Sequence, residues 1–110
     1  MSYKIETIAQ FDKELKSLVK KYPSFKSDFI TFISSLKENP IQGTPLGKNC
    51  YKIHLAIRDK GRGKSSGARI ITNFVIDNAT IYLLSIYDKS SKENLTDKQL
   101  NQLLMFIQEL

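Results

Sequence analysis

The sequence has one cysteine, no tryptophan and no long run of apolar residues. The single cysteine, Cys50, excludes an internal disulfide, and inside an apparent strand it is expected to be a small buried hydrophobic side chain. The first ten residues, MSYKIETIAQ, lack the apolar segment of a signal peptide, and no apolar run reaches the length that crosses a bilayer. We therefore expect a cytoplasmic protein that does not bind membranes.

Motifs for metal binding and for nucleophilic catalysis are also missing. The chain has one histidine, His54, and neither its cysteine nor its carboxylates have the spacing of a metal site or of a glycosidase pair. No nucleophilic triad is visible. These absences argue against a metal, a small-molecule cofactor and glycoside chemistry.

Acidic residues are few, with 11 Asp and Glu against 17 Lys and Arg, which gives a formal net charge of +6. The excess is concentrated in residues 48–69, where seven Lys or Arg accompany a single acidic residue, Asp59. Clustered positive charge in a small domain indicates a polyanionic partner, most often nucleic acid, or an acidic protein.

The most basic segment is RDKGRGKSSGAR, residues 58–69, which ends like a nucleotide-binding P-loop in Gly63, Lys64 and Ser65. A P-loop needs a further glycine five residues earlier, and Arg58 stands there. It also needs a helix to follow, but ARIITNFVID is rich in β-branched residues and predicts a strand. The segment is therefore either a solvated hairpin loop or a loop that contacts phosphates.

The 110 residues predict one domain, residues 1–110, with the element order β-α-α-β-β-β-α. Apolar stripes predict helices over residues 11–22, 25–36 (with Ser24 as its cap) and 95–110, the last opened by a capping box of Thr96 and Gln99. Strands are predicted over residues 2–8, 50–58, 69–77 and 80–87, with a tight turn at Asp77 and Asn78 and a loop over residues 39–49. This order is typical of an α+β fold with a mainly antiparallel sheet and helices packed on one face.

Strand alternation predicts which side chains share the open face of that sheet. Side chains two apart in a strand lie on one side, which collects Lys52, His54, Arg58, Arg69, Asn73, Ser85 and Tyr87. Lys89 and Lys92 follow the last strand. Cations of this kind can neutralise a phosphodiester, and an imidazole or a lysine can move its protons. A lone histidine on a strand is nevertheless more often structural than catalytic.

Two segments of the chain resemble the RelE/ParE toxin superfamily, in its HigB-like RelE branch. They are NCYKIHLAIRDKGRGKSSGARIIT and IYLLSIYDKSSKENLTDKQLNQLL, and the similarity extends over most of the chain, from residues 11–36 to the terminal helix. The resemblance implies the RelE-like fold and the toxin of a type II toxin–antitoxin pair. RelE members cut mRNA on the ribosome, without metal, through attack by the RNA 2′-OH, whereas ParE members act on DNA gyrase.

The resemblance also implies roles for single residues. Lys52 matches a catalytic lysine, Arg69 matches the arginine that stabilises the phosphate, and Tyr87 and Lys89 fall where relatives carry further active-site groups. His54 stands where relatives carry Lys or Arg, and Ser66 replaces a loop glycine. The expected catalytic set is therefore Lys52, His54, Arg69, Tyr87 and Lys89, and the expected RNA-binding set is Arg58, Lys60, Arg62, Lys64 and Lys92.

The sequence thus predicts a ribosome-dependent mRNA endonuclease that a cognate antitoxin neutralises. The basic loop is interpreted as a flexible flap that grips RNA backbone. Two alternatives stay open: a gyrase inhibitor, which needs no catalytic cations, and an inactive module that binds RNA or antitoxin.

Overall fold

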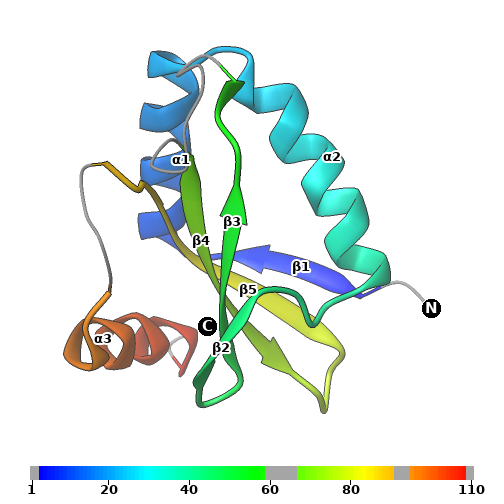
Figure 1. The fold of residues 1–110 in the computed structure, drawn as a ribbon. Coiled ribbons are helices and arrows are strands. Elements are labelled where there is room, and N and C mark those ends of the chain that lie inside the picture. The colour runs from blue at the N-terminus through cyan, green and yellow to red at the C-terminus, as the bar shows by residue number, and fades with distance from the viewer. Residues whose placement is uncertain (1–2, 59–66, 91–94, 109–110) are drawn as a thin grey trace.

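The computed structural model of the protein describes residues 3–58, 67–90 and 95–108. These residues form a five-stranded sheet with a pair of helices packed against it and a third helix apart from that pair (Figure 1). In chain order the elements are β1 (Lys4–Thr7), α1 (Ala9–Lys21), α2 (Phe25–Glu38), β2 (Thr44–Gly47), β3 (Cys50–Leu55), β4 (Ala68–Val75), β5 (Thr80–Asp88) and α3 (Asp97–Gln108). The α+β class and the mainly antiparallel sheet are confirmed.

The order of strands across the sheet is β1-β5-β4-β3-β2. The chain crosses from one edge strand to the other through α1 and α2, and then returns strand by strand. β2, β3, β4 and β5 pair antiparallel as chain neighbours, while β1 lies parallel to β5. Residues from three consecutive antiparallel strands can therefore meet on one face of the sheet.

β2 corrects the prediction that residues 39–49 form only a loop, which rested on their prolines and glycines. An edge strand tolerates proline because its outward-facing amide has no ladder partner to lose. Pro45 occupies such a position, opposite Tyr51 of β3. The short edge strand forms one wall of the candidate site described below.

The predicted strand ends also need correction. β3 ends at Leu55, three residues before the predicted end, and β4 ends at Val75. The turn between β4 and β5 covers residues 76–79, two more than predicted, and Ala79 adopts a positive φ of 48° within it.

α1 and α2 form a helical hairpin whose apolar faces supply much of the core. Phe11 and Leu18 of α1 and Phe25, Phe32 and Leu36 of α2 are all buried, as their helical spacing predicted. Ser24 precedes α2, but its side chain makes no cap hydrogen bond because its backbone is already helical, with φ −68° and ψ −18°.

α1 protects the part of β5 that β1 leaves uncovered. β1 pairs with β5 only from Thr80 to Leu83. Beyond that point Glu14 of α1 accepts hydrogen bonds from the Ser85 hydroxyl at 2.9 Å and from the Ile86 amide at 3.4 Å. A carboxylate thus satisfies backbone that would otherwise be an open sheet edge.

α3 begins with the predicted capping box. The Gln99 amide donates to the Thr96 hydroxyl at 3.1 Å, and the Thr96 amide donates to the Gln99 side chain at 2.9 Å. Leu100 and Leu103 are buried against the sheet, whereas Met105 is 61% exposed. Within the residues described, no helix combines the length and apolar character that crossing a membrane requires.

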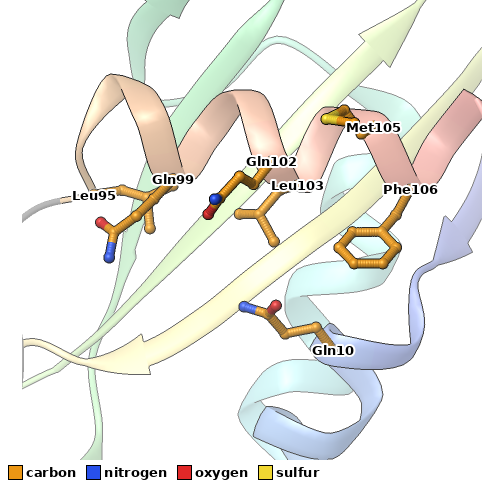
Figure 2. Close-up of a pocket in the computed structure, with 7 residues that line it drawn as sticks. All are labelled: Gln10, Leu95, Gln99, Gln102, Leu103, Met105 and Phe106. Atoms are coloured by element: carbon orange, nitrogen blue, oxygen red, sulfur yellow. The ribbon is translucent and has the colours of Figure 1, made fainter.

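A groove of about 610 Å³ lies between α3 and the start of α1 (Figure 2). Its lining is mixed, with glutamines beside apolar side chains: Gln10, Leu95, Gln99, Gln102, Leu103, Met105 and Phe106. Met105 and Phe106 are both exposed, so α3 presents apolar surface at this groove.

Asn73 of β4 holds the turn between β2 and β3. Its side-chain amide donates to the Lys48 carbonyl at 3.0 Å and to the Asn49 carbonyl at 3.4 Å. Lys48 also donates to the Asn101 side chain of α3. Cys50 is buried beside Asn73, as predicted, and burial raises the pKa of its thiol.

This arrangement predicts that Asn73→Ala destabilises the fold. The Lys48 and Asn49 carbonyls lose the Asn73 donor, although the Phe74 amide still donates to Asn49. The free energy of unfolding should therefore fall by about 0.5–1.5 kcal/mol, the net value of a typical hydrogen bond. Urea denaturation measures the change, and Ser34→Ala on the exposed side of α2 is the control, expected within about 0.5 kcal/mol of wild type. Equal stability of the two variants would show that Asn73 does not hold the turn.

Candidate functional site

A hollow of about 440 Å³ opens on the sheet where β2, β3, β4 and the end of β5 come together. The residues that line it are Gly43, Thr44, Lys52, His54, Arg69 and Lys89. Four of these belong to the predicted catalytic set. The structure therefore brings Lys52, His54, Arg69 and Lys89 into one hollow.

Sheet register explains how these side chains meet. Lys52 and His54 are two residues apart in β3 and so lie on the same face. Arg69 of β4 is the direct cross-strand partner of His54, and Thr44 of β2 is the partner of Lys52. Lys89 follows β5 immediately, and its amide donates to the Gly67 carbonyl at 2.9 Å.

The charges in the hollow have one sign. Lys52, Arg69 and Lys89 are cations, His54 can carry a proton, and the lining contains no carboxylate. Converging cations in a hollow focus a positive potential and favour an anionic ligand. Arginine adds a planar fork of N–H donors that matches two oxygens of a phosphate group. The hollow is suited to a phosphate or a phosphodiester.

Gly43 is required where β2 approaches β3. A Cβ on this residue would lie 2.2 Å from the Lys52 carbonyl oxygen, and Gly43 has a positive φ of 88°. Both facts favour glycine, because a side chain would collide with backbone and strain the conformation. Gly43 and Thr44 are members of the hollow that the sequence analysis missed, since it assigned their segment to a loop.

Tyr87 lies beside the hollow and is not part of its lining. It pairs across the sheet with Arg69, but its side chain is 7% exposed and lines a second groove with residues of α1. Burial raises the pKa of the phenol, while the charge and a hydrogen bond of Arg69 act to lower it and the charge of Glu14 acts to raise it. Tyr87 is thus a protonated, buried phenol that interacts with Arg69 from the neighbouring strand.

Three residues predicted for the open face lie elsewhere. Arg58 follows the end of β3 and forms an ion pair with Asp28 of α2, with 2.9 Å between Nε and Oδ2. Asn73 turns to the backbone of the β2–β3 turn, and Ser85 is buried against Glu14. Alternation failed for Arg58 because β3 ends before it. Ser85 keeps the strand parity of Tyr87, but Glu14 of α1 covers it.

The remaining predicted RNA-binding residues lie outside the described part of the chain. These are Lys60, Arg62 and Lys64 of the basic loop, and Lys92 after β5. In the part of the chain that is described, no group of three His, Cys, Asp or Glu side chains lies close enough to hold a metal ion.

No family model matches the chain. A variant of the E. coli toxin RelE in the free state matches it with a TM-score of 0.61 and 18% identity, over 96% of this chain and 97% of that chain. The chain has the RelE fold. The resemblance predicted from the sequence is confirmed at this level, whereas the HigB-like branch stays a prediction.

Two complexes show the same RelE fold. A chain of the intact E. coli RelBE toxin–antitoxin complex has a TM-score of 0.56 and 18% identity, over 77% of this chain and 94% of that chain. A chain of the toxin–antitoxin complex RelBE2 from Mycobacterium tuberculosis has a TM-score of 0.54 and 14% identity, over 80% of this chain and 99% of that chain.

The contacts of Tyr87 predict opposite effects of two substitutions on its pKa. Arg69→Ala removes the charge and the hydrogen bond that lower this pKa, so the pKa should rise further. Glu14→Gln removes a negative charge that raises it, so the pKa should fall. Titration of ¹³C-labelled tyrosine by NMR measures both shifts.

Arg58→Ala is the matched control, because Arg58 pairs with Asp28 and not with Tyr87. Arg58→Ala should leave the pKa of Tyr87 unchanged. A Tyr87 pKa that stays constant in Arg69→Ala would show that the guanidinium and the phenol do not interact.

Proposed function

We propose that the protein is the toxin of a type II toxin–antitoxin pair and acts as an endoribonuclease on mRNA at the ribosome. The observation that carries this proposal is the hollow of Lys52, His54, Arg69 and Lys89 on a RelE fold. The hollow has the groups that a phosphodiester needs, namely cations for the phosphate oxygens and proton carriers for the two ester oxygens.

The proposed reaction uses the nucleophile that RNA itself carries. The 2′-oxygen attacks the adjacent phosphorus and forms the new P–O2′ bond, while the P–O5′ bond breaks. The products are a 2′,3′-cyclic phosphate and a free 5′-hydroxyl. One proton leaves the 2′-OH and one proton reaches the departing 5′-oxygen, so the site needs a proton acceptor, a proton donor and charge stabilisation.

Each residue of the hollow takes one of these roles. His54 accepts the proton of the 2′-OH, because imidazole changes its protonation near neutral pH. Arg69 holds the two non-bridging oxygens as negative charge grows on them, and Lys52 adds a second positive charge. Lys89 delivers the proton to the 5′-oxygen. Tyr87 is assigned to support Arg69, because its buried phenol interacts with the guanidinium and is not part of the hollow.

This assignment predicts that Arg69→Ala slows cleavage of ribosome-bound mRNA by about a hundredfold or more, the scale of losing one donor to the transition state. Arg69→Lys should recover only part of the rate, because an ammonium keeps the charge but lacks the planar fork. Primer extension on translated mRNA measures the rate. The control is Lys26→Ala, which removes an equal charge from an exposed position of α2, and its cleavage rate should stay at the wild-type value.

A structural role for Arg69 would give a different pattern. It would lower the melting temperature clearly and weaken antitoxin binding at every salt concentration. The proposed role leaves the melting temperature close to wild type and weakens antitoxin binding mainly at low salt, as for Lys52→Ala. Full activity of Arg69→Ala would contradict the mechanism. Growth arrest with intact mRNA and inhibited DNA supercoiling would instead support the gyrase alternative.

The proposed partner is an antitoxin segment that is acidic, partly disordered when free, and folded when bound. Two surfaces support this: the cationic hollow, and the groove beside α3 where Met105 and Phe106 are exposed. Disordered segments of this kind bind by covering apolar and charged surface together.

The product of the neighbouring reading frame should therefore form a tight complex that is only partly sensitive to salt, because apolar burial contributes beside charge. Calorimetric titration at rising salt concentration measures this dependence. A Met105→Ser variant should weaken the complex at every salt concentration, whereas Lys52→Ala should weaken it mainly at low salt. Absence of a complex at moderate salt would contradict the proposed partner.

A further inference from the structure

Gly67 connects the basic loop to the hollow. It is the last residue before β4, it is buried, and its backbone has a positive φ of 146°. Its carbonyl accepts the Lys89 amide at 2.9 Å, which extends the β4–β5 pairing by one step. Gly67 also lies two residues before Arg69, so both face the side of the sheet that carries His54.

The imidazole of His54 lies directly against Gly67. A Cβ on Gly67 would be 2.4 Å from Cε1, 2.9 Å from Nε2 and 3.3 Å from Nδ1 of that ring. Real Cβ atoms do not approach other atoms as closely as the shortest of these distances, so the ring occupies the place where any other residue would have its side chain.

We propose that Gly67 is a positioning residue of the site: its missing side chain makes room for the His54 imidazole, while its carbonyl fixes the backbone of Lys89. This role rests on the proposed ribonuclease function, in which His54 and Lys89 carry the two proton transfers. One residue then sets the position of both groups relative to the phosphate that Arg69 holds.

Alanine substitutions at the three glycines with positive φ distinguish an effect on the His54 ring from an effect on the backbone. At Gly43 the obstacle to a Cβ is the Lys52 backbone, which cannot move without disturbing the sheet. At Gly67 the obstacle is the ring of His54, an exposed side chain that can rotate away. At Gly47, with φ 86°, a Cβ would meet nothing within 4 Å. Gly47→Ala therefore reports the cost of the backbone conformation alone.

Gly67→Ala should lower the rate of mRNA cleavage by about a hundredfold, the effect expected when a catalytic group moves by roughly 1 Å. RNA binding should stay near wild type, because Lys52, Arg69 and Lys89 keep their charges. The chain has one histidine, so the Cε1–H group of its imidazole gives a single ¹H–¹³C signal that reports on His54 directly. That signal should shift in Gly67→Ala and stay in place in the control, Gly47→Ala.

A double-mutant cycle with His54→Ala tests whether Gly67 acts through the ring. Once the ring is absent, Gly67→Ala should cause no additional loss of cleavage, and it should lower the melting temperature less than it does in the wild-type background. The second readout does not need activity, and it applies even if the single variant folds poorly. An equal drop in melting temperature in both backgrounds would overturn the proposal.

The NMR signal separates this proposal from the proposed function. An unshifted His54 signal in folded Gly67→Ala would overturn the positioning role, whatever the cleavage rate. A shifted signal in a protein whose wild-type form never cleaves RNA would overturn the ribonuclease function and would still support the contact between Gly67 and the imidazole.

Discussion

The candidate site depends on the register between β3 and β4. In this register Ile53 lies opposite Ile70, both buried, and His54 lies opposite Arg69 on the other face. A slip by one residue would exchange the two faces and bring charged side chains into the core. The apolar pair on the covered face therefore fixes the polar pair on the open face. Folding and site assembly have the same cause here.

A series of side-chain contacts connects the hollow to α1. Arg69 hydrogen-bonds to Tyr87, and the negative charge of Glu14 raises the pKa of Tyr87. Glu14 in turn accepts hydrogen bonds from the Ser85 hydroxyl and the Ile86 amide of β5. Each member has a partner on the next element, so the guanidinium rests on a buried phenol rather than on solvent. Such support limits the rotamers of the group that must meet the phosphate.

Local patterns predicted those parts of the molecule that depend on a single element. The stripes of α1 and α2, the capping box at Thr96 and the pairing of Lys52 with His54 on one face all follow from spacing within one helix or strand. Arg69 was predicted as well, because resemblance to RelE proteins and strand parity indicate the same residue.

The failures occurred where tertiary contacts override local pattern. The segment around Pro45 was predicted to be a loop because of its prolines and glycines. It forms an edge strand only through pairing with β3, which local sequence does not indicate. Strand alternation assigns Arg58 to the open face. Because β3 ends at Leu55, its guanidinium instead forms an ion pair with Asp28 of α2. Gly67 looked like one more loop glycine, and only the position of the His54 ring distinguishes it.

The hollow gathers Lys52, His54, Arg69 and Lys89 on one face of the sheet, and its lining contains no carboxylate. Arg69 also interacts with the buried phenol of Tyr87. A bound phosphate would therefore meet complementary charge. Because His54 is also the group that must accept a proton in the proposed reaction, its replacement of the lysine or arginine expected at this position is consistent with an active site rather than a degraded one.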